Sequence, residues 1–233
     1  MVLPPANGEL LLSNGEIHYL WWYIQGSIMN PHVRYQLRKN WGFCQRHAWG
    51  AILVEASFRH GHMHGPAIVY EDILGIAASA MDVKGPFINL RLPVSLRDRG
   101  PCLMCNMGLG PESRGAASPD LVTRGQDATE LRVFARTTRA HWEKNVCGRC
   151  LGNEARPRCR RHLIEDASRG MVNRFSQHRD LIDYMFEQIT LYARSFRWEF
   201  QGTETEENKA ALISAVGWCS GWQLFLPIIG MEK

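Results

Sequence analysis

Eight residues in the sequence have the types and the spacing of metal ligands. They form four pairs with two residues between the partners: Cys44 and His47, Cys102 and Cys105, Cys147 and Cys150, and Cys159 and His162. Thiolates and imidazoles at this spacing can turn both donors toward one ion, and zinc binds four such donors tetrahedrally. The pairs use every cysteine except Cys219 and add up to two Cys3His sets. The sequence therefore predicts two bound zinc ions.

The spacing leaves open which pairs share an ion. Residues 147–162 are close enough in sequence to form a compact zinc knuckle, and residues 44–47 and 102–105 would then clip the N-terminal helices to a connector. In a crossed arrangement, residues 102–105 would join 159–162 while residues 44–47 would join 147–150. Four protein donors are typical of a closed, structural zinc site, whereas a catalytic zinc keeps a position for water. We expect both ions to be structural.

Two features could instead support a thiol- or metal-dependent enzyme. CGRC at residues 147–150 has the spacing of a redox dithiol, but it lacks the βαβ setting of thioredoxin-like motifs. HGHMHG, which includes His60 to His64, could bind copper or nickel or supply general bases, with Glu71 or Asp72 as nearby acids. The sequence contains no G-x-S-x-G elbow, P-loop or H-E-x-x-H motif. An enzyme therefore remains the alternative interpretation.

Basic residues gather in residues 132–161, which hold eight arginines and one lysine against two glutamates, in a chain of net charge +4. Arginine held beside a zinc knuckle could bind phosphates or an acidic protein surface. The candidate contact residues are Arg132, Arg136, Arg139, Arg156, Arg158, Arg160 and Arg161. We predict an interaction or adaptor module whose partner is a protein or a nucleic acid.

The predicted fold is all-α, because no stretch alternates at period two while apolar residues recur at helical spacing. It is a bundle-like domain stapled by two zinc sites, with long irregular connectors at 83–101 and 106–125. Capping boxes are predicted at Asp127-x-x-Glu130 and at Thr203-x-x-Glu206. The predicted helices span residues 16–29, 31–40, 44–58, 66–81, 127–145 and 176–199, with a last one after residue 203.

The length of 233 residues fits one domain of ordinary size. Its parts are the N-terminal helices with the first C-x-x-H pair (1–100), the zinc-binding connector with the basic segment (101–170) and a C-terminal helical pair (171–233). Cysteines in ligand pairs and the lack of an evident signal peptide favour a reducing cytoplasm. Residues 210–231 carry no formal charge and are long enough to cross a bilayer. Their polar and small residues favour a core helix with an apolar tail, and Cys219 is expected to be a buried small hydrophobe.

The order of the motifs resembles an uncharacterised bacterial family, a domain of unknown function. GFCQRHAWG, AIVYEDIL, CLMC and CRRHL carry the resemblance, which covers roughly residues 16–218, and GFC-x-x-HA is its most specific element. The family has a further C-x-x-C upstream of GFC, whereas residues 1–43 here contain no cysteine. If residues 147–150 replace it in space, the crossed arrangement is favoured. The resemblance implies metal binding and a helical fold, and no known reaction.

Overall fold

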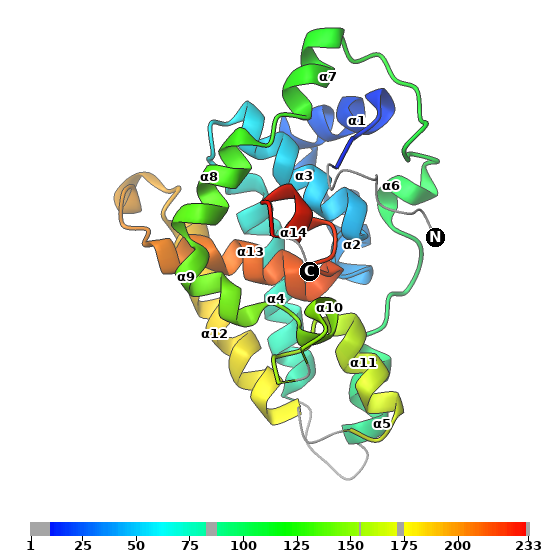
Figure 1. The fold of residues 1–233 in the computed structure, drawn as a ribbon, viewed down its shortest axis with the longest axis vertical. Helices are drawn as coiled ribbons and strands as arrows, with labels where there is room; N and C mark the ends of the chain where they lie inside the picture. Colours follow the sequence, from blue (N-terminus) through cyan, green and yellow to red (C-terminus); the bar gives the residue numbers. More distant parts are fainter. Residues whose placement is uncertain (1–9, 83–87, 154, 172–174, 232–233) are drawn as a thin grey trace.

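The computed structural model describes residues 10–82, 88–153, 155–171 and 175–231. Every regular element within these ranges is a helix, and none of these residues forms a strand, so the predicted all-α fold is confirmed (Figure 1). In chain order the helices are α1 (Asn14–Ile24), η1 (Ser27–Met29), α2 (Pro31–Lys39), α3 (Gln45–Phe58), α4 (His64–Met81), α5 (Ile88–Ser95), α6 (Leu103–Asn106), α7 (Pro119–Gly125), α8 (Thr129–Thr137), α9 (Arg139–Trp142), η2 (Glu143–Asn145), α10 (Gly148–Leu151), α11 (Arg160–Ser168), α12 (Phe175–Arg194), η3 (Trp198–Phe200), α13 (Glu206–Ser220) and α14 (Phe225–Ile228).

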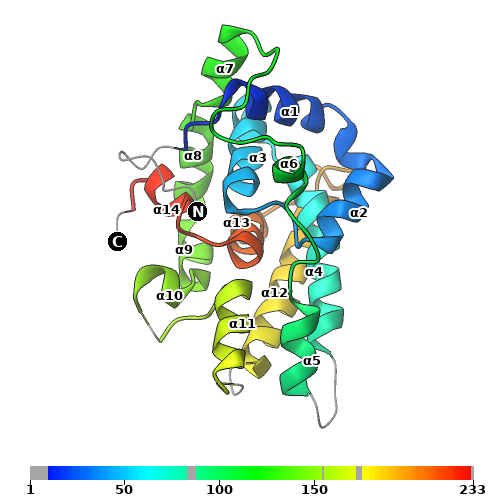
Figure 2. The same cartoon turned by 90° about the vertical axis from the view of Figure 1, so that its right-hand side faces the viewer.

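Helices α3 and α13 form the centre of the molecule. Both are apolar around most of their circumference, and a helix with that pattern has to be buried on all sides. The long helices α4 and α12 pack along each other, and α12 also packs on α13. Helix α7 lies at one end of the long axis, while α5 and α11 lie side by side at the other (Figure 2). This core is the frame on which the short helices hold the cysteines.

The C-terminal segment folds back onto the core. Trp49 on α3 stacks on Phe225 with ring centroids 4.2 Å apart, and its Nε1 donates a hydrogen bond to the carbonyl oxygen of Gly221. The ring of Trp222 lies against Gly217, where a Cβ atom would be only 2.2 Å from the indole. Residues 210–231 are thus a core helix with an apolar tail. Among the described residues, no helix is long and apolar enough to cross a membrane.

Both predicted connectors contain a helix. Residues 88–95 form α5 with Pro93 near its end, and residues 119–125 form α7, which begins at Pro119 under a Ser118 cap. Proline is compatible with the first helical position because the amide hydrogen that it lacks would have no partner there. The connectors predicted at 83–101 and 106–125 are therefore irregular only in part, while residues 83–87 lie outside the described ranges.

The two predicted capping boxes do not form as expected. Helix α8 begins at Thr129, whose amide donates to the Asp127 carboxylate at 2.9 Å in a local turn. The helix predicted for residues 127–145 is divided at Thr138, whose hydroxyl bonds the carbonyl oxygen of Phe134 at 2.8 Å. Helix α13 is capped by a Thr205–Asn208 box, two residues later than predicted. Helix α2 begins at Pro31, where the predicted helix 31–40 begins, and Asn30 caps it.

Candidate metal centres

The eight predicted ligands lie in two groups, and in each group all donor atoms are within 4.8 Å of one another. The first cluster consists of Cys44, His47, Cys102 and Cys105, and the second cluster consists of Cys147, Cys150, Cys159 and His162. Each is a Cys3His set that could hold a metal ion. The crossed arrangement, which the family resemblance favoured, is therefore wrong.

All four ligand pairs are built in the same way. In each pair one ligand is the N-cap of a helix and the other is the third residue of that helix, so that both side chains reach the same side. The N-cap residues are Cys44 for α3, Cys102 for α6, Cys147 for α10 and Cys159 for α11. The N-terminal end of a helix carries partial positive charge, which favours the thiolate over the thiol. The clusters thus combine four donors with two helix N-termini each.

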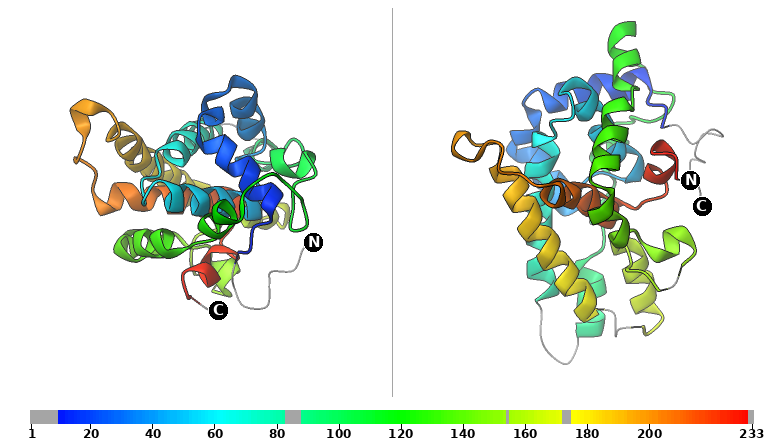
Figure 3. Two further views of the ribbon diagram at one scale, coloured as in Figure 1. Left: turned by 90° about the horizontal axis from the view of Figure 1, so that it is seen from above. Right: turned by 60° about the vertical axis from the view of Figure 1, so that its left-hand side comes forward.

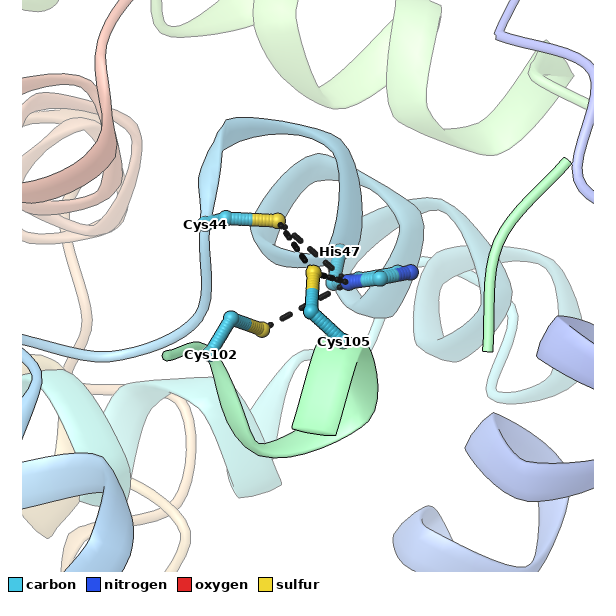
Figure 4. Close-up of side chains that lie close together, drawn as sticks. All are labelled: Cys44, His47, Cys102 and Cys105. Atoms are coloured by element: carbon cyan, nitrogen blue, oxygen red, sulfur yellow. Dashed lines mark hydrogen bonds between the residues drawn. The ribbon is translucent and has the colours of Figure 1, made fainter. Parts of the chain in front are cut away.

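Distances in the first cluster fit a tetrahedral zinc ion. The Nδ1 atom of His47 lies 3.3 Å from the sulfur of Cys44 and 3.5 Å from those of Cys102 and Cys105 (Figure 4). The sulfurs of Cys44 and Cys105 are 3.8 Å apart. Zinc bonds of about 2.3 Å to sulfur and about 2.0 Å to nitrogen place tetrahedral donors roughly 3.5 to 3.8 Å apart.

The second cluster has the same dimensions. The Nδ1 atom of His162 lies 3.2 Å from the sulfur of Cys147, 3.6 Å from that of Cys150 and 3.3 Å from that of Cys159. Its three cysteines are buried, whereas Cys105 in the first cluster is exposed. CGRC thus contributes both cysteines to a four-donor set.

The pKa values of the ligands show that the three cysteines of a cluster cannot all ionise easily when their sulfurs are in contact. A hydrogen bond with Cys44 lowers the pKa of Cys102 to about 4, while the same bond, burial and the charge of Cys102 raise the pKa of Cys44. In the second cluster, bonds with Cys147 and Cys150 raise the pKa of His162 to about 9. Three thiolates in contact repel one another, so each donor set can be fully ionised only around a cation.

Glu16 on α1 orients the histidine of the first cluster. Its carboxylate is fully buried. It accepts hydrogen bonds from the Nε2 atom of His47 at 3.0 Å, from the guanidinium of Arg46 at 2.6 and 2.8 Å and from the amide of Ser13 at 2.7 Å. Burial alone would raise the pKa of Glu16, but the bonds from His47 and Arg46 outweigh it and lower the pKa to about 2. A carboxylate on Nε2 leaves Nδ1 free for the metal.

Sequence reasoning missed this role of Glu16. Its one sequence signal is the Ser13-x-x-Glu16 spacing of a capping box, which the structure contains at the start of α1.

Buried ion pairs support the second cluster. Asp166 on α11 accepts from the Nε atom of Arg158 at 2.8 Å and from Arg149 at 3.1 Å. Arg158 is 1% exposed, and its amide donates to the Nε2 atom of His178 at 2.8 Å. The chain on either side of Cys159 is therefore fixed by charged groups inside the protein.

Two of the predicted partner-contacting arginines are internal, which corrects that part of the prediction. Arg158 is buried as described, and Arg160, 6% exposed, bonds the carbonyl oxygens of Cys219 and Leu96 and the carboxylate of Asp98. Neither side chain can reach a partner in this fold, because both are buried. Arg158 pairs with the buried Asp166, and Arg160 pairs from below with the exposed Asp98.

The other five arginines lie at or near the surface, and the side chains of four of them already bond to other groups of the chain. Arg132 donates to the carbonyl oxygen of Ile228 and Arg156 to that of Glu143, both at 2.8 Å. Arg139 and Arg161 form exposed ion pairs with the glutamates four residues after them, Glu143 and Glu165. Arg136 is exposed. The basic segment thus contributes less free positive charge than its composition suggested.

The remaining candidates do not assemble into a site. His60, His62 and His64 are exposed, and none of them belongs to a group of metal ligands among the described residues. The imidazole of His64 stacks on Phe196 with centroids 4.5 Å apart. Cys219 is buried among apolar side chains, as predicted.

Comparisons of the chain with protein-family models, with curated proteins and with solved structures find no match. The resemblance to the bacterial family therefore stays a prediction, and the function has to be argued from the geometry of the chain itself.

Proposed function

We propose that this chain is a zinc-binding helical protein whose two metal ions are structural, and that it acts as an interaction module for a protein partner. Each cluster offers four protein donors, which is the closed set that structural zinc takes. Zinc binding of this kind contributes directly to folding, because the unfolded chain has no preformed site. Thiolate ligands persist in a reducing compartment, so the cytoplasm is the proposed location.

The observation that supports the interaction role is a highly exposed tryptophan on a projecting turn. Trp198 is 84% exposed in η3, within the connection between α12 and α13, which projects from the body of the molecule (Figure 3). The guanidinium of Arg194 lies 4.5 Å from the ring centroid of Phe200, and backbone bonds of 3.0 and 2.9 Å close the turns at Arg197 and Phe200. An indole held out on a braced turn is the kind of anchor that dominates protein–protein interfaces.

A protein partner fits the surface better than a nucleic acid does. Nucleic-acid binding depends on arginines and lysines free to neutralise phosphates. Arg158 and Arg160 are buried, and Arg139 and Arg161 already face a glutamate. The partner we propose carries an apolar pocket that can receive the Trp198 ring.

Native mass spectrometry of the purified chain tests the metal role. We expect two zinc ions per chain, one for each cluster. Removal of zinc with a chelator should lower the melting temperature by roughly 10 °C or more, because loss of several kcal/mol shifts a chain of this size by that amount. A chelated protein that melts like the zinc-loaded one contradicts a structural role.

Affinity capture with the full chain tests the interaction role, with Trp198→Ala compared against Trp22→Ala. Trp22 is also exposed but lies on α1, so it controls for the loss of any surface indole. We expect a protein captured by the native chain and by Trp22→Ala, with retention reduced roughly tenfold or more by Trp198→Ala. Equal capture by both variants, or capture of nucleic acid that high salt abolishes, contradicts the proposal.

A further inference from the structure

The two clusters differ in how far a reagent can reach their sulfurs. Cys105 is exposed and Cys44 is partly exposed, whereas Cys147, Cys150 and Cys159 are each at most 2% exposed. Oxidation of a thiolate requires that the oxidant reach the sulfur, so susceptibility follows exposure as well as charge. A small oxidant therefore meets the first cluster long before the second.

We propose that Cys105 is a peroxide-oxidisable site, that Cys44 resolves its oxidation as a disulfide, and that zinc is released from the first cluster alone. This inference rests on the proposed structural-zinc function. The oxidant is hydrogen peroxide or an alkyl hydroperoxide, which the surroundings must supply.

The chemistry takes place in two balanced steps. The Cys105 thiolate attacks one peroxide oxygen, the O–O bond breaks, and a sulfenic acid and hydroxide form. The Cys44 thiolate then attacks the sulfenic sulfur, an S–S bond forms, and the S–O bond breaks with loss of a second hydroxide. Two thiolates have been oxidised by two electrons in all and one hydrogen peroxide has been reduced. Zinc keeps two of its four ligands and leaves as Zn²⁺.

The positions of the sulfurs support this pairing. The Cys44 and Cys105 sulfurs are 3.8 Å apart and come from different segments, the start of α3 and the one-turn helix α6 (Figure 4). A disulfide requires an S–S distance of about 2.0 Å, so the sulfurs have to approach by roughly 2 Å. Helix α6 contains only four residues and lies outside any longer helix, so the approach displaces a single helical turn. The disulfide would replace the metal as the link between α3 and α6.

The burial of the second cluster explains its predicted resistance. Its cysteines lie below the surface, and Arg149, Arg158 and Asp166 pair beside them. Peroxide can reach these sulfurs only if α10 or α11 moves away from the core. The second zinc should therefore stay bound while the first is released.

The test uses the full-length, zinc-loaded chain, treated with hydrogen peroxide in the presence of a chromogenic zinc chelator. We expect one zinc released per chain, a mass loss of about 2 Da for the two thiol hydrogens, and a disulfide joining Cys44 to Cys105 in the peptide map. With dimedone present, the adduct should be found on Cys105. Reductant and added zinc should restore the starting metal content. Cys219→Ala is the matched control, because it removes the buried cysteine outside both clusters and should leave these results unchanged.

Three results would overturn the inference: equal zinc release from both clusters, a dimedone adduct confined to another cysteine, or a disulfide that excludes Cys44. Its failure differs from failure of the proposed function. Fewer than two zinc ions before any peroxide is added contradicts the structural-zinc proposal. Two zinc ions with no selective release overturns only the role of Cys105.

Discussion

The first and second clusters have the same donors and the same helix-start geometry, but they join very different lengths of chain. Cys44 and Cys105 are 61 residues apart, whereas Cys147 and His162 are 15 residues apart. The first cluster also depends on Glu16 from a third segment, α1. The second is a local knuckle that can form early, while the first requires α1, α3 and α6 to be placed already.

Loop length and burial make opposite predictions about which cluster contributes more to the stability of the fold. Closing the longer loop constrains the unfolded chain more, which favours the first cluster by about 1 kcal/mol. Against this, the second cluster has three buried sulfurs and buried ion pairs around it, and an uncompensated buried polar or charged group costs several kcal/mol. Burial therefore outweighs loop length. The same donor geometry lies in the core in one place and near the surface in the other.

The largest expected effect comes from removing one ligand of each cluster in turn. Cys159→Ser should lower the melting temperature by roughly 10 °C or more or prevent folding, because it leaves a buried donor set without its ion. Cys105→Ser should lower it by about half as much, since Cys105 itself is exposed and its replacement is solvated. Thermal unfolding with parallel zinc analysis measures both. If Cys159→Ser does not fold, circular dichroism will still show which variant loses more helical structure. Equal losses of stability in the two variants would show that burial does not determine which cluster matters more.

A smaller effect is expected when the ion pairs around the second cluster are broken. Asp166→Ala removes the carboxylate that Arg158 and Arg149 share and should reduce the free energy of unfolding by about 3 kcal/mol. Asp98→Ala is the matched control, because Asp98 pairs with Arg160 but is itself exposed and should cost about 1 kcal/mol. Chemical denaturation gives both values. Similar losses for the two variants would mean that the buried pair contributes no more than a surface one.

The sequence predicted the ligands because ligand spacing is a local property. All eight donors, the helical fold and the start of α3 beside Cys44 follow from patterns a few residues long. The pairing could not be predicted, since both arrangements satisfy the same donor count and differ only in which helices meet. Glu16 was missed for the same reason, because its partner His47 is 31 residues away.

The charge pattern, in contrast, predicted contact residues that the fold places in the interior. A run of arginines such as 156–161 was interpreted as a surface, although Arg158 and Arg160 are buried and pair with Asp166 and Asp98. Those acids, Asp166 and Asp98, are visible in the sequence. Asp166 meets Arg158 across the start of α11, whereas Asp98 meets Arg160 only because α5 packs on α11. Composition counts charges and cannot say which of them face inward.

Loss of the carboxylate beside His47 should have a more limited effect. Glu16→Gln keeps the shape of the side chain but removes the negative charge that fixes the His47 ring. It should weaken zinc binding in the first cluster roughly 10- to 100-fold while the second cluster serves as an internal control. Chelator competition followed by native mass spectrometry measures the two ions separately. Glu112→Gln, an exposed acid on the segment after α6, should change neither affinity. An equal loss at both clusters would contradict a local role for Glu16.

The smallest expected effect separates overall stability from metal binding. Glu55 lies on α3 away from both clusters, and burial raises its pKa to about 7, against a hydrogen bond from the Gly65 amide that lowers it. Because the folded pKa exceeds the unfolded value near 4.5, its contribution to stability is full below pH 4.5 and is lost as the pH rises through 7. Glu55→Gln should therefore be more stable than the native chain at pH 8, by about 1 kcal/mol or roughly 2 to 4 °C, and the difference should shrink toward pH 6. Its zinc content should stay at two, and Glu187→Gln, a change at an exposed glutamate, should leave the stability of the chain unchanged at pH 8. A variant that gained stability and also lost zinc from the first cluster would show that α3 couples Glu55 to the metal, so that stability and metal binding in this chain are not separable.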